Sequence, residues 1–350
     1  MFWLTLLAFL VILGLLVFVH ELGHFLMAKA NGVKVEEFAF GFPPKLICKK
    51  RGETKYCINL IPFGGYVKML GEERDEHSSR SFSRKKPRQK FLIIVAGVLM
   101  NFILAGFLLG IGYMVGMSPI RLNPEQLGGQ QNHQVIVAQI QSDSPAQVAD
   151  LKSGDIILGF ETVDAFRAFT VSKSNQDITL LIKRDGENLE KQIHVSQNSV
   201  APIGVGIVDV PSVKLPFFKA IYFGFKEMLF TTGYVFVILL SFLKGIFFKG
   251  QIANEVAGPI GIFNITGEAV KMGIAYLIQL AAILSINLGL VNILPFPALD
   301  GGRAVIIAAE GATGKKVIKT EIENFLHMIG FIILILFILF ITFREVIALL

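Results

Sequence analysis

The chain has 350 residues, 53% of them hydrophobic, and a mean hydropathy of +0.61. This composition is typical of a protein that crosses a membrane several times, and it excludes an ordinary soluble enzyme. The net charge is +6 but unevenly spread: residues 28–90 hold 15 Lys and Arg against 7 Asp and Glu, whereas residues 118–217 hold 8 against 11. Because positive loops stay in the cytoplasm, we expect residues 28–90 inside and residues 118–217 outside. The basic run before residue 91 is interpreted as a topology signal that contacts the lipid bilayer, and no nucleic acid is expected as a partner.

Four segments are long and apolar enough to cross the bilayer. They are residues 1–28, 91–117, 272–299 and 325–343. A fifth uncharged run, Met228–Leu243, has only 16 residues, so hydropathy alone does not decide whether it is inserted. If it crossed, the end of the 272–299 span would emerge outside; if it lies flat, that end emerges on the cytoplasmic side. We therefore expect residues 217–248 to form an interfacial amphipathic helix.

The first apolar segment carries a His-Glu-x-x-His motif at its inner end, where charged side chains are costly. His20 and His24 are four residues apart, so on a helix both face one side and are able to bind one zinc ion. Glu21 lies beside that face and is predicted to act as a general base. A chance coincidence of these residues is the competing interpretation.

A catalytic zinc site normally takes three protein ligands. Asp300 follows the 272–299 span, and Pro295 and Pro297 must interrupt helical geometry just before it. Broken helix at membrane depth is tolerated where it lines a buried or watered cavity. Asp300 is therefore predicted as the third ligand, although an acidic residue that simply ends a helix is the alternative.

Residues 29–90 form the predicted β region. Val33–Phe40 and Tyr56–Ile61 have the β-branched and aromatic content of strands. Two cysteines, Cys48 and Cys57, fall on the predicted cytoplasmic side, where a disulfide is not expected, so both are interpreted as packing residues.

Residues 125–210 are predicted to form a small soluble domain. Gln134–Ile140 and Ile178–Lys183 have strand character, and Ser144-Pro145 begins a short helix. The stretch from Ser144 to Ile157 resembles the SPAxxAGLxxGDxI signature of PDZ domains, with Asp150 in place of the usual Gly. Any other small β-rich domain is the alternative. A PDZ domain binds extended peptide ends by strand addition.

Together, HExxH in the first span, a PDZ-like middle and Asn-x-x-Pro-x-Pro-x-Leu-Asp-Gly-Gly near the end resemble the bacterial site-2 protease family, the group that includes the sigma-E-regulating protease. The resemblance covers essentially the whole chain. It implies that His20, His24 and Asp300 hold one Zn²⁺ and that Glu21 is the catalytic base. It also implies a substrate-contacting set made of Gly64, Gly65, Tyr66, Val67, Asn287, Asn292, Pro295 and Pro297.

For the fold, we therefore expect a membrane α-helical protein with four transmembrane helices, a membrane-associated β element and one inserted extracytoplasmic PDZ domain. By resemblance the stretch around Gly64–Val67 dips into the membrane beside the zinc, although a plain cytoplasmic hairpin is the alternative. Chance asparagines in the third span would instead serve helix packing.

The function implied by the resemblance is cleavage of single-span membrane proteins in the bacterial cytoplasmic membrane, with trimmed anti-sigma factors and remnant signal peptides as substrates. Some relatives carry two PDZ domains, whereas residues 118–217 have room for one. Two other classes remain open: a non-catalytic PDZ scaffold or receptor, and a transporter whose intramembrane charges line an ion path.

Overall fold

The computed structural model describes residues 1–72, 76–184, 187–197, 201–249 and 257–349. The chain divides into two compact units. The first comprises Met1–Leu108, Met228–Gly267 and Leu280–Leu350, and the second comprises Leu109–Glu227 and Glu268–Gln279. Each unit is described by itself below.

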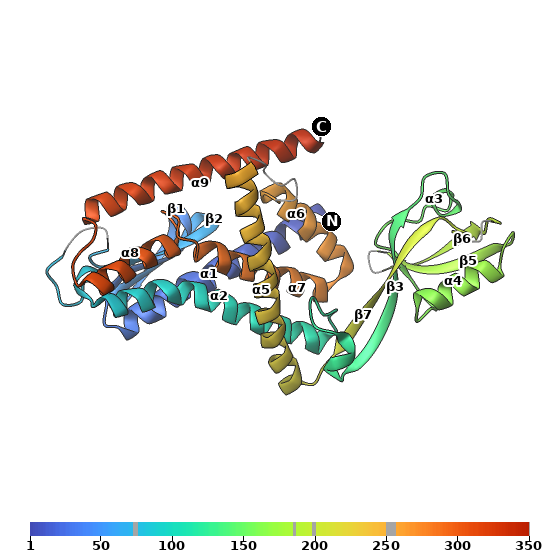
Figure 1. Ribbon diagram of the computed structural model, residues 1–350, viewed down its shortest axis with the longest axis horizontal. Helices are drawn as coiled ribbons and strands as arrows, with labels where there is room; N and C mark the ends of the chain where they lie inside the picture. Colours follow the sequence, from blue (N-terminus) through green and yellow to red (C-terminus); the bar gives the residue numbers. More distant parts are fainter. Residues whose placement is uncertain (73–75, 185–186, 198–200, 250–256, 350) are drawn as a thin grey trace. The chain divides into compact units, whose positions relative to one another are not determined.

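The first unit is built from long apolar helices around a β-hairpin (Figure 1). The helices that lie in it wholly or in part are α1 (Phe2–Ala30), α2 (Pro87–Val115), α5 (Phe217–Lys249), α6 (Pro259–Met272), α7 (Ile274–Asn292), α8 (Asp300–Thr313) and α9 (Thr320–Leu349). A short 3₁₀ helix, η1 (Phe82–Arg84), precedes α2. Their apolar side chains mostly point outward, because only 28% of the most apolar window of α1 and 11% of that of α9 is buried inside the protein. Side chains of this kind are satisfied by lipid rather than by a protein core.

Among the described residues, five helices are long and apolar enough to cross a membrane, one more than the four predicted spans. The additional one is α5, a continuous helix of 33 residues whose bounds agree with the helix expected over residues 217–248, and its interfacial placement stays a prediction. Within α5, the buried Glu227 carboxylate accepts hydrogen bonds from the Tyr113 hydroxyl and from the backbone N–H of Arg121. Such partners lower the cost of burying a carboxylate in an apolar helix.

The predicted 272–299 span is shorter and is broken as the prolines indicated. Helix α7 ends at Asn292, residues 293–299 are irregular, and α8 begins at Asp300. Helices α6 and α8 were not predicted. The other three predicted spans correspond to α1, α2 and α9 with small shifts at their ends.

The β region is a two-stranded sheet of β1 (Val35–Arg51) and β2 (Thr54–Met69), which join in a hairpin that turns at Gly52. Residues 37–40 of β1 pair with both residues 65–68 and residues 55–58 of β2. Both predicted strands lie within it. Its base packs on α1 and α2 through a buried apolar cluster that includes Val35, Phe38 and Ile94. The far arm, which includes Leu46 and Ile47, is exposed.

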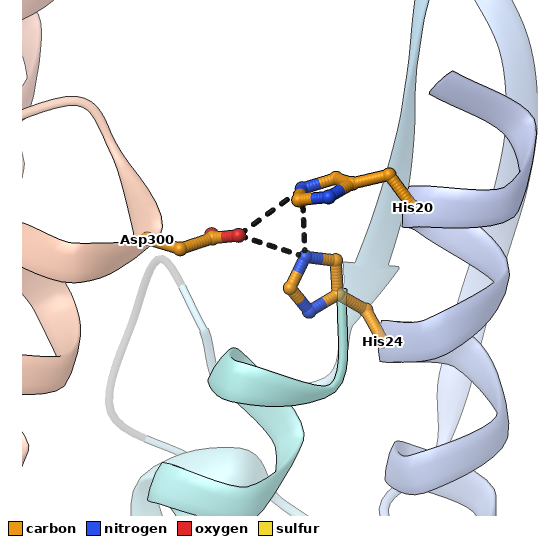
Figure 2. A group of neighbouring side chains, drawn as sticks. All are labelled: His20, His24 and Asp300. Atoms are coloured by element: carbon orange, nitrogen blue, oxygen red, sulfur yellow. Dashed lines mark hydrogen bonds and ion pairs between the residues drawn. The ribbon is translucent and has the colours of Figure 1, made fainter. Parts of the chain in front are cut away.

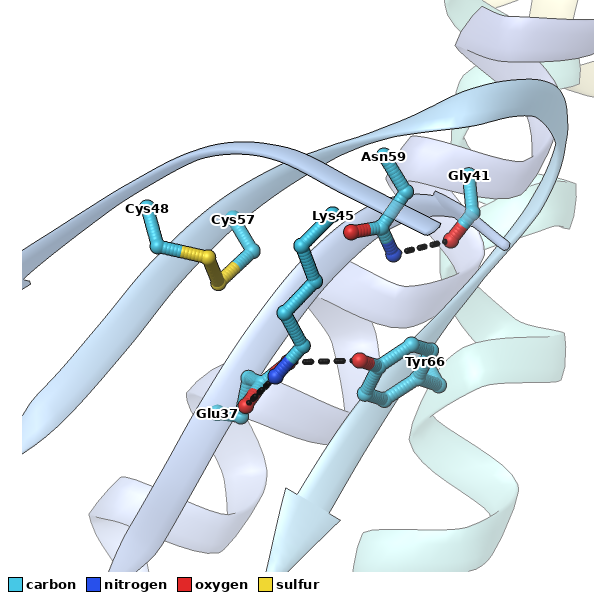
Figure 3. Close-up of a disulfide and its surroundings, with 7 residues drawn as sticks. All are labelled: Glu37, Gly41, Lys45, Cys48, Cys57, Asn59 and Tyr66. Atoms are coloured by element: carbon cyan, nitrogen blue, oxygen red, sulfur yellow. Dashed lines mark hydrogen bonds and ion pairs between the residues drawn. A yellow bond between two sulfur atoms is a disulfide. The ribbon is translucent and has the colours of Figure 1, made fainter. Parts of the chain in front are cut away.

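Cys48 and Cys57 form a disulfide across this hairpin, so their interpretation as separate packing residues is wrong for this structure (Figure 3). The two residues are directly opposite each other in the register of β1 and β2, with Cα atoms 4.2 Å apart. Facing positions in an antiparallel pair bring the two Cβ atoms close enough to bridge. The prediction rested on the redox compartment alone, because the sequence does not show which residues of the two strands face each other.

The second unit contains a five-stranded antiparallel sheet in the order β6-β5-β4-β3-β7. Its strands are β3 (Gln130–Ile140), β4 (Ile156–Ile157), β5 (Asp177–Arg184), β6 (Glu187–His194) and β7 (Val205–Lys214), and its helices are η2 (Pro124–Leu127), α3 (Pro145–Val148) and α4 (Val163–Ser172). The predicted strands fall in β3 and β5, and the Ser144 hydroxyl caps α3. Strand β5 alternates buried and exposed residues, as a strand with one face on a core does. That this unit is a PDZ domain stays a prediction.

Candidate metal centre

The two histidines of the first helix lie together as their spacing predicted. His20 and His24 are one turn apart on α1, both are buried, and their Nε2 atoms are 3.3 Å apart. A four-residue separation on a helix places side chains on the same face, one above the other.

Asp300 joins them from the opposite end of the chain (Figure 2). Its Oδ2 atom is 3.1 Å from His20 Nε2 and 3.2 Å from His24 Nε2. The irregular segment between α7 and α8 delivers it there, and the Nδ1 atom of His327 accepts a hydrogen bond from the backbone N–H of Ala298 in that segment. Ala298 has φ +79, a conformation that a non-glycine residue adopts at some cost. The break predicted from the prolines therefore serves to place Asp300.

These three donor atoms fit a zinc ion. Zinc takes His nitrogen and carboxylate oxygen at about 2.0–2.2 Å, and ligands in a tetrahedron of that size lie about 3.3 Å from one another. The three distances of 3.1, 3.2 and 3.3 Å match this spacing. Asp300 Oδ2 is also buried and forms no hydrogen bond of normal geometry, which is expected when neighbouring lone pairs converge on a shared point. Among the described residues, this is the cluster of His and acidic side chains arranged to hold a metal ion.

Glu21 lies at the same site. It lines a cavity of about 330 Å³ together with His20, His24 and Asp300. The backbone of β2 passes directly beside it, since a Cβ added to Gly65 would lie 3.2 Å from Glu21 Cγ. A carboxylate in a cavity next to three metal-binding atoms is placed to exchange a proton with a reacting group.

Five of the eight residues predicted to contact a substrate border this cavity. They are Gly64, Gly65, Tyr66, Val67 and Asn292. Asn287, Pro295 and Pro297 are not among the described residues that line it. The prolines instead belong to the irregular segment before Asp300, and Pro295 is exposed.

Two charged residues at the cavity were not predicted as part of the site. Arg303, one turn after Asp300 on α8, forms an ion pair with Glu72 at 2.5 Å, and both side chains line the cavity. The spacing of Arg303 from Asp300 would have indicated it, because residues three apart on a helix share a face.

A second cavity, of about 460 Å³, shares Tyr66, Glu72 and Arg303 with the first. It contains Glu37, which accepts hydrogen bonds from Lys45 at 2.6 Å and from the Tyr66 hydroxyl at 2.5 Å (Figure 3). Burial favours the neutral carboxyl, but these two bonds outweigh it, and the pKa of Glu37 is lowered. The Tyr66 side chain is therefore held by an ionised partner on β1.

A membrane-embedded metal centre built from HExxH and a distant Asp is the arrangement of an intramembrane zinc peptidase of the site-2 type. The model of peptidase family M50 matches residues 8–337. The chain belongs to peptidase family M50, the site-2 protease family.

Curated relatives agree with this assignment. The zinc metalloprotease RasP of Shouchella clausii is 30% identical, with 98% of each chain covered, and the RasP of Geobacillus kaustophilus is 28% identical, with 98% of this chain and 97% of the relative covered. A Clostridium perfringens protein whose name also describes a zinc metalloprotease is 35% identical over 95% of both chains. The protein is thus a multi-pass membrane zinc metalloprotease.

Proposed function

We propose that this protein cuts the membrane-spanning segments of single-span proteins, with His20, His24 and Asp300 as zinc ligands and Glu21 as the general base. The observation that carries the proposal is the convergence of three donor atoms within 3.3 Å of one another, beside a carboxylate in a cavity. The chemistry that zinc supplies in such a site is Lewis-acid activation of water and of the scissile carbonyl.

Glu21 would take a proton from the attacking water and return it to the leaving amine. A carboxylate in the cavity wall beside the three donor atoms would be within reach of a reacting group in both steps. Glu72 and Arg303 neutralise each other at 2.5 Å, so the cavity carries this ion pair without an added net charge.

The β2 segment Gly64–Val67 would hold the substrate. A peptide bond in a helix is shielded by its own hydrogen bonds, so a spanning segment must be extended before it is cut. Addition of the substrate as a strand beside an existing strand supplies backbone partners for that extended form. Gly65 brings the β2 backbone to within van der Waals reach of Glu21, so a strand docked here would lie next to the base.

The sheet of β3–β7 is proposed to be a PDZ domain on the extracytoplasmic side, with the metal centre near the cytoplasmic side of the bacterial membrane. Its role would be to exclude substrates with large outer domains until another protease has trimmed them. Trimmed anti-sigma factors and remnant signal peptides are the proposed substrates. The charge asymmetry of the loops supports this orientation.

The test is co-expression of a tagged single-span substrate with a truncated outer domain, together with wild type, Glu21→Gln or Glu36→Gln. Glu36 is a carboxyl on β1 that does not line the cavity described here, so it controls for the amide change itself. Cleavage by wild type and Glu36→Gln, but not by Glu21→Gln, is expected, and a zinc chelator should abolish it in purified enzyme. Full activity of Glu21→Gln would exclude this mechanism.

A further inference from the structure

Helix α2 presents one strip of residues to the two histidines. Ile93, Gly97 and Asn101 are spaced four apart, so they share one face of the helix. The main-chain carbonyl of Ile93 lies beside His24 Nδ1, and the side-chain amide of Asn101 lies beside His20 Nδ1. The backbone of Gly97 lies against both rings. This strip is called the α2 face below.

The Ile93 carbonyl fixes the proton of His24. His24 Nδ1 lies 2.9 Å from that oxygen, and a carbonyl oxygen only accepts hydrogen bonds. Nδ1 must therefore carry the hydrogen, and a neutral ring then has its free lone pair on Nε2. That is the atom that faces Asp300.

His20 has an equivalent partner in Asn101. The Asn101 side chain is fully buried, and its amide group lies 3.1 Å from His20 Nδ1. With the amide nitrogen toward the ring, Asn101 Oδ1 is buried and has no hydrogen-bond partner. A half-turn of the amide exchanges its nitrogen and oxygen at almost no geometric change. The oxygen then accepts from His20 Nδ1–H and leaves His20 Nε2 free for the metal, as in His24.

Gly97 lets the two rings rest directly on the helix. A Cβ added there would lie 2.4 Å from His24 Nε2 and 2.9 Å from His20 Cε1, closer than van der Waals contact allows. Any larger residue would push the rings away from their positions. The α2 face is therefore shaped to the histidine pair as well as bonded to it.

The position of Asn101 is itself fixed from α7. The Ser285 hydroxyl donates to the main-chain carbonyl of Asn101 at 2.8 Å, and both side chains are fully buried. This bond ties α2 to the helix that leads to Asp300. It holds the backbone of Asn101 and does not touch either histidine.

We propose that Asn101 is a positioning residue of the metal centre: its side-chain oxygen accepts a hydrogen bond from His20 Nδ1–H and so directs His20 Nε2 at the zinc. This inference rests on the proposed role of His20, His24 and Asp300 as zinc ligands. Outer partners of this kind set the tautomer and the ring orientation of a ligand, and their loss typically lowers metal affinity 10- to 100-fold.

The experiment measures zinc affinity of the purified full-length protein by competition with a chromophoric chelator. Asn101→Leu removes the acceptor and should weaken zinc binding by about 10- to 100-fold. Asn101→Asp keeps an oxygen in the same place and should restore affinity close to that of wild type. Thr266→Ala is the control: it removes a buried hydroxyl that bonds to the Ile262 carbonyl in its own helix, and it should leave the affinity near wild type.

Cobalt substitution gives a second readout. The visible absorption of Co²⁺ reports the geometry of its ligands, so Asn101→Leu should shift the spectrum whereas Asn101→Asp and Thr266→Ala should retain it. If the leucine variant fails to accumulate, Asn101→Ala removes the same oxygen without adding bulk and is expected to give the same loss.

Wild-type zinc affinity in a folded Asn101→Leu or Asn101→Ala protein would overturn the inference. Equal losses in Asn101→Leu and Asn101→Asp would also overturn it, because they would indicate a packing role. A wild-type protein that binds no zinc would overturn the proposed function itself, and the two failures are thereby distinguished.

Discussion

The helical unit and the five-stranded sheet place polar and apolar side chains in opposite ways. On β5 the apolar residues Leu180 and Ile182 are buried in a core, as in a water-soluble domain. On α9 apolar side chains such as Leu336 are exposed, while the helical unit buries His20 and Asn101. In lipid an apolar exterior is satisfied and a polar interior is costly. A buried polar residue is therefore a functional signal in the helical unit, whereas burial in the sheet mainly reports packing.

The largest effect is expected from Asp300→Ala. It removes one of three donor atoms, so zinc affinity should fall by more than the 10- to 100-fold that loss of an outer partner produces. Zinc content of the purified protein measures it. Hydrogen exchange of β3–β7 should stay at the wild-type level, and a loss of protection there would contradict the separation of the two units.

In the sheet, Ile182→Ala should reduce the local stability of the second unit by about 2–5 kcal/mol, because it opens a cavity in the core. Leu181→Ala, the next residue on β5, points outward and should change stability by less than about 0.5 kcal/mol. Hydrogen exchange of β5 peptides in the full-length protein measures both. Similar effects from the two variants would refute the assigned alternation.

The same substitution at two exposed leucines tests the contrast directly. Leu336→Lys in the middle of α9 should cost about 3 kcal/mol of membrane insertion, because lysine is placed in the hydrocarbon region. Leu181→Lys on β5 faces solvent and should be nearly neutral. A membrane-insertion assay for the first and hydrogen exchange for the second measure these effects. Normal insertion of Leu336→Lys would show that α9 does not face lipid there.

The smallest effect concerns acid stability of the sheet unit. Hydrogen bonds from Lys191 and Arg184 lower the pKa of Asp150 to about 2. A carboxylate with a lowered pKa stabilises the fold above its ordinary pKa near 3.8, and that contribution is lost as the pH falls through about 2. Asp150→Asn should therefore reduce the loss of stability between about pH 4 and pH 2. Hydrogen exchange or proteolysis in that range measures it, and an unchanged slope would contradict the pairing.

Asp150 also shows how the sequence departure from the PDZ signature is accommodated. The residue has φ +55, a conformation in which glycine is free and aspartate is one of the better-tolerated substitutes. Its carboxylate then pairs with Lys191 and Arg184, an interaction that glycine lacks. Asp150 thus adopts a backbone conformation that glycine would also adopt without strain.

Local patterns predicted which side chains meet at the candidate metal centre, because the HExxH spacing and the prolines before Asp300 carry their own geometry. The contribution of α2 was not predicted. Asn101 is a polar residue in an otherwise apolar span, and such a residue indicates a functional role. Whether Asn101 reaches His20 depends on how α1 and α2 pack, and no local sequence pattern specifies that packing. The contact of the Ile93 carbonyl with His24 could not be predicted from the sequence, because every residue has a backbone carbonyl.

The misjudged cysteine pair depended on tertiary context. The Cys48–Cys57 bond follows from the register of β1 and β2, a pairing that the sequence does not state. A redox argument describes the compartment around a cysteine, whereas the disulfide depends on which residue faces that cysteine.

The metal centre joins two points that are about 275 residues apart along the chain, since His24 and Asp300 meet at 3.2 Å. The entropy of closing so long a loop grows only with the logarithm of its length, so about 90 further residues would cost only a few tenths of a kcal/mol. The alignment with the Shouchella clausii relative runs to 437 positions, more than this chain has residues. The chain between His24 and Asp300 could therefore lengthen by about 90 residues at little entropic cost to the meeting of these two side chains.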